Sequence, residues 1–476
     1  MPGAVRTIAA FFDRDRPAPS LPLYLLFGLL VRLPAILFAH GFEFVDQQFQ
    51  YIDPAWHPAS GDDWLMTHEW INGLRSWVYP GMLAPVLRAF AWIEDPLVRM
   101  AAVRGVHAVV SLLPLAAFWM LVVQWRPLPR PRSALLFFAL SGLLVYAGTQ
   151  PSGPTFAAGL ATAAVLLFLG PAPWAPLGAG LCLGLAFCCR FQDALFGPVL
   201  FAAGLLTRRW KQSLWLALGC VPPLLLQALV DLKTWGALFH SPLAFLRFNV
   251  IEGRSAQWAT RPFWYYFALG VVPYLLLVPP FLRANLDCLR RAASRLAIPL
   301  AAAAFYLLVL SLIPRKSMRF TLPAFTILSA VLAVGLFELP LREGLAAWHK
   351  RLVTTFQIGI LILLSFHQFN RGPIQAAIAL GEDPGFTGEL TVVDGQKTDV
   401  GGYYYLHRKK VNLELVRRED LAGRAARLAP FLMVVRLPLE PALVEELGAE
   451  FLGAFSNCPD HSRGRRRFLY RLPRIP

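Results

Sequence analysis

Long apolar stretches separated by short polar segments recur along the chain up to about position 370. Many of them reach about 17 to 25 residues, the length a helix needs to cross a hydrocarbon core of roughly 30 Å. We therefore predict an all-α polytopic membrane protein.

Eleven such segments are expected to be transmembrane helices. They are Leu21 to Ala39, Val103 to Val123, Ala134 to Gly148, Thr155 to Leu169, Trp174 to Cys189, Phe191 to Leu206, Leu214 to Val230, Phe263 to Leu282, Leu296 to Ile313, Phe320 to Phe337 and Leu352 to Phe366. The segment Pro80 to Ile93 is interpreted as an interfacial or re-entrant helix, because an extra crossing there would invert every later loop.

Composition supports a membrane protein, since 56% of the residues are hydrophobic and only 16% are charged. A soluble protein carries about 25% charged residues. The formal charge of +16 comes mainly from basic clusters between apolar spans, the usual signal of cytoplasmic loops. Assigning these clusters to the cytoplasm excludes a nucleic-acid-binding role and leaves residues 1–20 as a cytoplasmic N-terminus.

The same charge rule places the loop at residues 40–102 outside the cytoplasm. This loop concentrates carboxylates and aromatic side chains in a chain otherwise poor in acids. Its acids include Asp46, Asp53, Asp62, Asp63 and Glu69. Carboxylates just beyond a membrane helix suit chemistry on a polar group carried by a lipid.

Two further outer loops are basic, against the usual bias. The first runs from Asp231 to Pro262 and contains Arg261; the second contains Arg315, Lys316 and Arg319. Guanidinium groups match phosphate oxygens in bidentate geometry, so we expect these loops to bind a phosphate. Binding of lipid headgroups or pairing with nearby acids is the alternative.

The remaining segment, residues 371–476, alternates short strand-like runs, at residues 390–393, 411–415 and 431–435, with helix-like stretches such as Glu419 to Leu428. It is expected to be a small extracytoplasmic α/β domain following a transmembrane domain at residues 21–370. Covering the active site, contacting an acceptor and packing on the membrane face are all compatible with its sequence.

Three ordered blocks resemble glycosyltransferase family 22, the GT-C-fold mannosyltransferases of asparagine-linked-glycan and GPI-anchor assembly. The first block lies in the 40–102 loop, around Asp46, Glu69 and Arg75; the second contains Asn249, Arg261 and Tyr265; the third runs from Arg315 to Phe320. Gln47, Arg261, Arg315 and Ser317 depart from the family pattern, which has an acid, two histidines and a glutamate there. These departures indicate a distant, bacterial member.

The resemblance implies a GT-C-like enzyme that moves a sugar, mannose in most relatives, from a polyprenyl-phosphate donor to a glycan or glycolipid hydroxyl. One displacement inverts the anomeric centre and needs a single base with no covalent intermediate. Asp46 matches the family's acid and is the expected catalytic base; capping of a helix in the loop is the alternative.

Several residues are expected to bind substrate. Arg315, Lys316 and Arg319 would hold the donor phosphate with help from Arg261. The other candidates are Gln47, Asp53, Glu69, Arg75, Arg190, Asn249 and Tyr265. A structural salt bridge for Glu69 and a helix-end pair between Arg190 and Asp193 are the alternative interpretations.

We expect no cofactor and no protein-bound metal. The expected partners are the polyprenyl-phosphate sugar donor, a glycan or glycolipid acceptor and membrane lipids. The expected location is the bacterial cytoplasmic membrane with the active site facing outside, or the endoplasmic reticulum with a lumenal site in a eukaryote. A lipid or sugar transporter or flippase and a non-catalytic assembly subunit are the competing functions.

Overall fold

The computed structural model describes residues 20–42, 45–257, 260–268, 279–337, 345–457 and 466–473. Most of the predicted N-terminal segment 1–20 therefore lies outside the described residues, as does much of the predicted span from Phe263 to Leu282. The chain divides into two compact units. A helical unit comprises the chain up to Ile36, Ser76–Val78 and Arg104–Ser365, and a mixed unit comprises Leu37–Arg75, Tyr79–Val103 and Phe366–Pro476.

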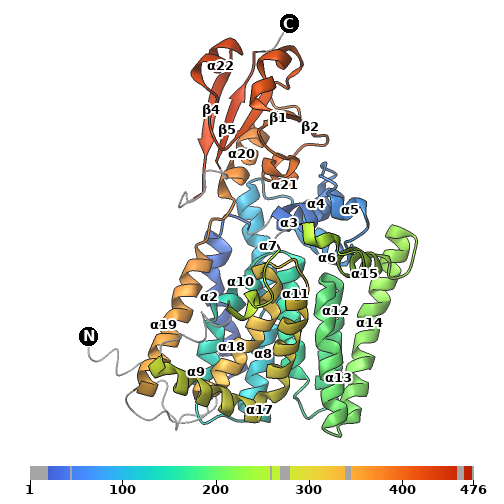
Figure 1. Ribbon diagram of the computed structural model, residues 1–476, viewed down its shortest axis with the longest axis vertical. Helices are drawn as coiled ribbons and strands as arrows, with labels where there is room; N and C mark the ends of the chain where they lie inside the picture. The colour runs from blue at the N-terminus through green and yellow to red at the C-terminus, as the bar shows by residue number, and fades with distance from the viewer. Residues whose placement is uncertain are drawn as a thin grey trace. The chain divides into compact units, whose positions relative to one another are not determined.

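The helical unit is built from apolar helices (Figure 1). Within the part that the structure describes, five helical segments are long and apolar enough to cross a membrane: Leu21–Phe38, Pro96–Trp125, Trp210–Trp235, Arg295–Leu312 and Met318–Phe337. A sixth candidate is the pair α9 (Pro131–Ala139) and α10 (Gly142–Thr149), bent by 50° at its break. Shorter apolar helices lie at Gly153–Leu167 (α11), Trp174–Cys189 (α12) and Phe191–Leu206.

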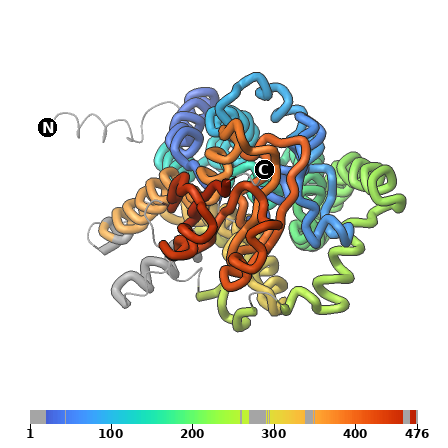
Figure 2. Tube along the Cα trace, turned by 90° about the horizontal axis from the view of Figure 1, so that it is seen from above, coloured from blue at the N-terminus to red at the C-terminus, as the bar shows by residue number. Residues whose placement is uncertain are grey.

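Small residues bring the helices of this unit together. Helices α12 and α14 (Trp210–Trp235) lie side by side in both views (Figures 1 and 2). A Cβ atom added to Gly180 would lie 2.0 Å from the carbonyl oxygen of Leu216, and one added to Gly219 would lie 2.1 Å from that of Leu177. Only glycine allows the two backbones to come this close. Small residues are common between membrane helices, because in lipid the hydrophobic effect does not drive helices together and close packing does.

Helix α18 (Leu322–Phe337) forms the centre of the helical unit. Thirteen of its side chains and Gly335 are buried, which explains why its sequence has no polar face. It packs against α17 (Pro279–Leu312), whose helical geometry is interrupted at Leu296. The unit continues to α19 (Leu345–Ser365), which contacts α10.

The mixed unit contains a five-stranded sheet in the order β2-β1-β3-β5-β4. Its strands are β1 (Glu389–Val393), β2 (Asn412–Val416), β3 (Phe431–Val435), β4 (Glu450–Phe455) and β5 (Arg467–Arg471). The first three are parallel, whereas β5 is antiparallel to both β3 and β4. Every residue of the central strand β3 is buried, as expected for a strand covered on both faces.

The predicted strand-like runs agree with β1, β2 and β3 to within one residue. The helix expected over Glu419 to Leu428 is instead two 3₁₀ turns, η8 (Arg418–Asp420) and η9 (Ala422–Arg427). Neither turn buries a side chain, Gly423 lies within η9, and Leu421 between the turns is the one buried residue of the stretch, so tertiary packing does not support a longer α-helix.

The segment around the predicted outer loop belongs to the mixed unit and is mostly helical. It contains α3 (Val45–Gln47), the π-turn η1 (Gln48–Ile52), α4 (Asp53–Ser60), α5 (His68–Ile71) and α6 (Val78–Ala89), the last of which begins in the helical unit. Helix α6 has 12 residues, too few to span a bilayer. Arg88 is exposed near its end. Helices α20 (Arg371–Glu382) and α21 (Tyr403–Leu406) contact each other in the same unit.

Candidate functional site

The expected base, Asp46, lies in the first turn of α3 and is half-buried. It is part of a continuous run of helix in which η1 and α4 follow directly. Asp46 therefore stands inside this helical run instead of preceding it as a capping residue does. Its neighbour Gln47 is buried, with 4% of its surface exposed.

Two acids of this region act on one arginine. Burial lowers the pKa of the Arg75 guanidinium, but the charges of Tyr51, Glu69 and Asp46 outweigh that effect and hold the pKa above its usual value. An Arg75 Nη2 atom lies 4.0 Å from Oε1 of Glu69, and both side chains are about a quarter exposed or less. We refer to Asp46, Glu69 and Arg75 as the acidic cluster.

Asp53, expected to contact substrate, gives both carboxylate oxygens to the protein itself. It is 1% exposed and accepts hydrogen bonds from the backbone N–H groups of Tyr403 and Tyr404, each at 3.0 Å, and from Nε2 of Gln48 at 2.6 Å. Burial raises the pKa of Asp53 to about 6, although the three donated bonds act in the opposite direction. Its geometry is that of a residue that positions α4.

The second candidate group lies in the helical unit, where two chain segments are joined. Thr260 and Arg315 form an antiparallel bridge, and the N–H of Arg261 donates to the carbonyl of Pro314 at 3.2 Å. The N–H of Ser317 donates to the hydroxyl of Tyr266 at 3.1 Å. These contacts place Arg261, Arg315 and Arg319 on neighbouring segments of backbone. We call these three arginines the cationic cluster.

Lys316 has a different environment from these arginines. It is 4% exposed, and its ammonium donates to the carbonyls of Arg261 at 3.1 Å and Ile313 at 2.7 Å. Arg261 is exposed, and Arg315 and Arg319 are half-buried. Lys316 thus holds the two segments together, whereas the arginines retain access to the surface.

Arg190 fixes the backbone that carries Arg319. Its two terminal nitrogens donate to the carbonyls of Arg319 at 3.0 Å and Phe320 at 3.2 Å, and its guanidinium stacks over the Phe320 ring at 5.3 Å. Its Nε atom lies 3.9 Å from Oδ1 of Asp193, which also accepts from the Tyr306 hydroxyl at 2.8 Å. Arg190 therefore pairs with Asp193 at the helix end and also holds the backbone at Arg319 and Phe320.

The second resemblance block contributes two further candidates with different surroundings. The Asn249 side chain donates to the carbonyl of Phe245 at 2.9 Å, within its own helical turn. Tyr265 is half-buried beside Tyr266, with 5.6 Å between the ring centroids. Through Tyr266 and Ser317, Tyr265 adjoins the cationic cluster.

Sequence reasoning missed a buried polar chain in the helical unit. The Ser76 hydroxyl donates to Oε1 of Gln227 at 2.8 Å, and Nε2 of Gln227 donates to the Ser241 hydroxyl at 3.1 Å. That hydroxyl in turn contacts Asp231, which is fully buried. Gln227 and Asp231 lie four residues apart in an apolar span, and such polar residues are a signal that could have identified them.

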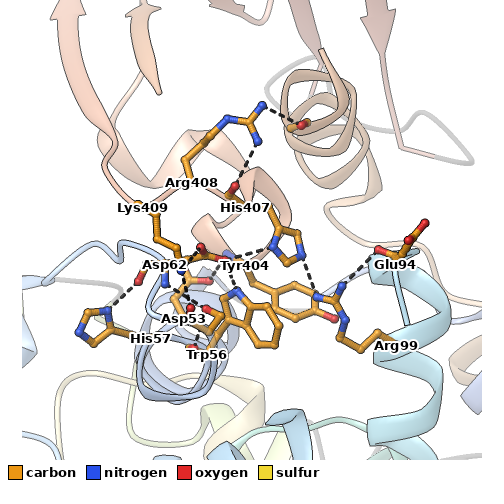
Figure 3. A network of polar contacts seen from close by, with 12 residues as sticks. Asp53, Trp56, His57, Asp62, Glu94, Arg99, Tyr404, His407, Arg408 and Lys409 are labelled. Carbon is orange, nitrogen blue, oxygen red and sulfur yellow. Dashed lines mark hydrogen bonds and ion pairs between the residues drawn. The ribbon is translucent and has the colours of Figure 1, made fainter. Parts of the chain in front are cut away.

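Another set that sequence reasoning missed lies in the mixed unit, where Arg99 and His407 contact each other (Figure 3). No spacing of sequence motifs relates these two positions. Over the described ranges, no group of three or more His, Cys, Asp or Glu side chains is arranged to hold a metal ion.

The chain is similar in sequence to known mannosyltransferases. The chain is 24% identical to GPI mannosyltransferase 3 of Drosophila melanogaster over 373 residues, which cover 74% of this chain and 63% of that protein. It is 34% identical over 110 residues to a probable Dol-P-Man:Man(7)GlcNAc(2)-PP-Dol alpha-1,6-mannosyltransferase of Schizosaccharomyces pombe, covering 22% of this chain and 19% of that protein. The match thus spans less than two thirds of the length of these relatives.

A solved structure gives the fold. The crystal structure of ArnT from Cupriavidus metallidurans bound to undecaprenyl phosphate matches with a TM-score of 0.61 and 14% identity, covering 94% of this chain and 97% of ArnT. The fold is therefore the GT-C fold expected from the three sequence blocks. The family model for Alg9-like mannosyltransferases matches residues 23–381, three quarters of the chain and all three blocks. The chain therefore belongs to the Alg9-like mannosyltransferase family.

Proposed function

We propose that this protein is a membrane mannosyltransferase that moves a sugar from a polyprenyl-phosphate donor to a hydroxyl of a glycan or glycolipid. The observation that carries the proposal is the cationic cluster. Arg190 holds the backbone of this cluster in place by donating hydrogen bonds to the carbonyls of Arg319 and Phe320. Family membership supports the reaction type. The name of the fly relative supports transfer of mannose, the name of the yeast relative supports a lipid-linked mannose donor, and the lipid bound to ArnT supports a polyprenyl phosphate.

Each cluster has a proposed role of its own in the reaction. The acceptor oxygen attacks the anomeric carbon and passes its proton to Asp46, while Glu69 and Arg75 orient the acceptor. The bond from the anomeric carbon to the phosphate oxygen breaks, and its electron pair stays on the phosphate. Arg261, Arg315 and Arg319 stabilise the negative charge that builds up on the departing lipid phosphate as this bond breaks. One displacement inverts the anomeric configuration.

We further propose that the chain crosses the membrane eleven times and that the sheet-containing C-terminal domain is extracytoplasmic. Alternating basic loops support this arrangement. Ten of the eleven expected spans coincide with apolar helical segments of the described chain, including the bent pair and α19. Half of the other, Phe263 to Leu282, lies outside the described residues. The proposed location is the bacterial cytoplasmic membrane, with the reaction on its outer side.

The test uses purified full-length protein in lipid nanodiscs with radiolabelled polyprenyl-phosphate mannose and a mannoside acceptor. Asp46→Asn should abolish transfer, whereas Glu382→Gln, at an exposed acid of the same unit, should leave it unchanged. Arg319→Gln should lower kcat/KM at least about 100-fold, the loss typical of removing one group that stabilises the transition-state charge. The matched control is Arg208→Gln, at an exposed cation remote in sequence.

The outcomes separate the competing functions. Full transfer by the Asp46→Asn variant would remove that residue from the mechanism. Equal losses for Arg319→Gln and Arg208→Gln would refute the phosphate role of the cationic cluster. Movement of the donor across the bilayer without cleavage would establish a flippase instead. If the donor is neither cleaved nor moved across the bilayer, the result would favour a non-catalytic assembly subunit.

A further inference from the structure

The C-terminal part of the mixed unit binds the helix that follows Asp46 at both of its ends. At the start of α4, the Asp53 carboxylate accepts the N–H groups of Tyr403 and Tyr404 at the beginning of α21. The same carboxylate accepts from Gln48, two residues after Asp46 in the helical run. The first turn of α21 is thereby attached to the helical segment that carries the proposed base.

A second set of contacts holds the end of α4 (Figure 3). Asp62 accepts from Nε1 of Trp56 at 2.9 Å and contacts Nδ1 of His407 at 3.1 Å. Lys409 donates to the carbonyl of Ser60 at 2.5 Å and lies 3.5 Å from Asp62. Burial raises the pKa of Asp62, but the hydrogen bonds from His407 and Trp56 and the charge of Lys409 outweigh burial and hold that pKa below its usual value.

His407 connects Asp62 with a buried arginine. Its Nε2 atom lies 2.7 Å from Nη1 of Arg99, whose guanidinium lies over the rings of Trp56 at 4.7 Å and Tyr404 at 5.4 Å. An arginine can only donate, so Nε2 of His407 must accept and Nδ1 must carry the proton that is donated to Asp62. The contact geometry therefore requires the neutral imidazole in one tautomer.

The approach of the two segments is close enough to require glycine. Gly402 has φ +129°, and a Cβ atom there would lie 2.5 Å from the Gln48 side chain. Gly401 has φ +85°, and its Cβ would lie 2.1 Å from the carbonyl oxygen of Pro373. The carbonyl of Arg408 also accepts from the N–H of Asp63 at 2.9 Å. The contacts thus run from Gly402 to Lys409 along the whole length of α4.

We propose that residues 401–409 act as a clamp that positions the Asp46 helix for the proposed transfer reaction, with His407 and Asp53 as positioning residues. The inference rests on the proposed function for its effect on rate. Because α3, η1 and α4 form one helical run, a shift of α4 would move Asp46 by a similar amount. A displacement of about 1 Å at a reacting group can cost about 100-fold in rate.

The clamp is tested with a pair of substitutions at His407. His407→Gln keeps one donor for Asp62 and one acceptor for Arg99, whereas His407→Leu removes both. Arg417→Ala, at an exposed ion pair with Glu419, is the control in the same domain. Each full-length variant is assayed in nanodiscs for kcat and for donor KM, and its backbone hydrogen exchange is followed over residues 45–60.

His407→Leu should lower kcat by about 10- to 100-fold with donor KM changed less than about twofold, and should speed exchange over residues 45–60. His407→Gln should restore both readouts to within about threefold of the wild type. Unchanged exchange in His407→Leu, whatever its rate, would overturn the clamp. So would equally fast exchange in His407→Gln. A wild type that transfers no sugar while exchange still responds to His407→Leu would instead overturn the proposed function and leave the clamp standing.

Discussion

Arg190 allows stability and activity to be separated by experiment. Its side chain is 4% exposed, that of Asp193 is fully buried, and the guanidinium also donates to the carbonyls of Arg319 and Phe320. We consider two variants, Arg190→Met and the double variant Arg190→Met with Asp193→Leu. The first leaves a buried carboxylate without its cation, and the second removes both charges.

The magnitudes follow from these contacts. Removing one partner of a buried ion pair costs about 3 to 5 kcal/mol, because the remaining charge is left uncompensated. Replacing both partners by apolar residues is neutral or stabilising by about 1 to 4 kcal/mol relative to the intact pair. The double variant should therefore recover most of the stability that Arg190→Met loses. It should not recover activity, since neither variant supplies donors for the carbonyls at Arg319 and Phe320.

Thermal unfolding in nanodiscs measures the stability of both variants, and mannosyl transfer measures kcat/KM. We expect a low midpoint for Arg190→Met, a midpoint near the wild type for the double variant, and a loss of at least about tenfold in kcat/KM for both, the effect of about 1.4 kcal/mol. Recovery of kcat/KM together with stability would refute the reasoning, because Arg190 would then serve only to compensate Asp193.

Two further predictions concern the contacts around α4. Because the folded-state pKa of Asp53 is raised to about 6, the folded state binds more protons than the unfolded state between about pH 4 and 6, so the free energy of unfolding should fall by about 3 kcal/mol as pH rises through that range. Chemical unfolding should show a flatter dependence of this free energy on pH for Asp53→Asn than for the wild type. Equal slopes for the two proteins would contradict the assignment. Gly402→Ala should lower the free energy of unfolding by about 1 to 3 kcal/mol through its positive φ and the contact with Gln48; Gly423→Ala, which meets nothing within 4 Å, is the control, and equal melting temperatures would contradict the close approach.

Much of the helical unit was predictable because hydropathy is a local property. The predicted segment Leu214 to Val230 lies inside α14, and Trp174 to Cys189 coincides with α12. The strand runs were predictable for a similar reason, since β3 is buried on both faces and its five residues are all apolar. The helix expected at Glu419 to Leu428 is wrong because residues 422–427 are all exposed and include Gly423, so packing supports no α-helix there although Leu421 is buried.

The candidate residues were predictable only as residue types in blocks. The blocks placed Asp46 with Glu69 and Arg75, and the charges of both acids do act on Arg75. They gave no reason to expect that Asp53 would bind the backbone of Tyr403, 350 positions away in the chain. Backbone N–H groups are the same at every residue, so a sequence carries no signal for which of them a carboxylate will choose.

The sequence by itself determined that this chain enters a membrane, which spans are apolar, and which family blocks carry acids and cations. These properties depend on residue type and on neighbours in the chain. Only the tertiary structure decided that Arg190 holds the Arg319 carbonyl, that Lys316 joins two loops, and that His407 accepts from Arg99. Those roles depend on contacts between distant segments, where a buried donor must meet whichever acceptor the fold brings within about 3 Å.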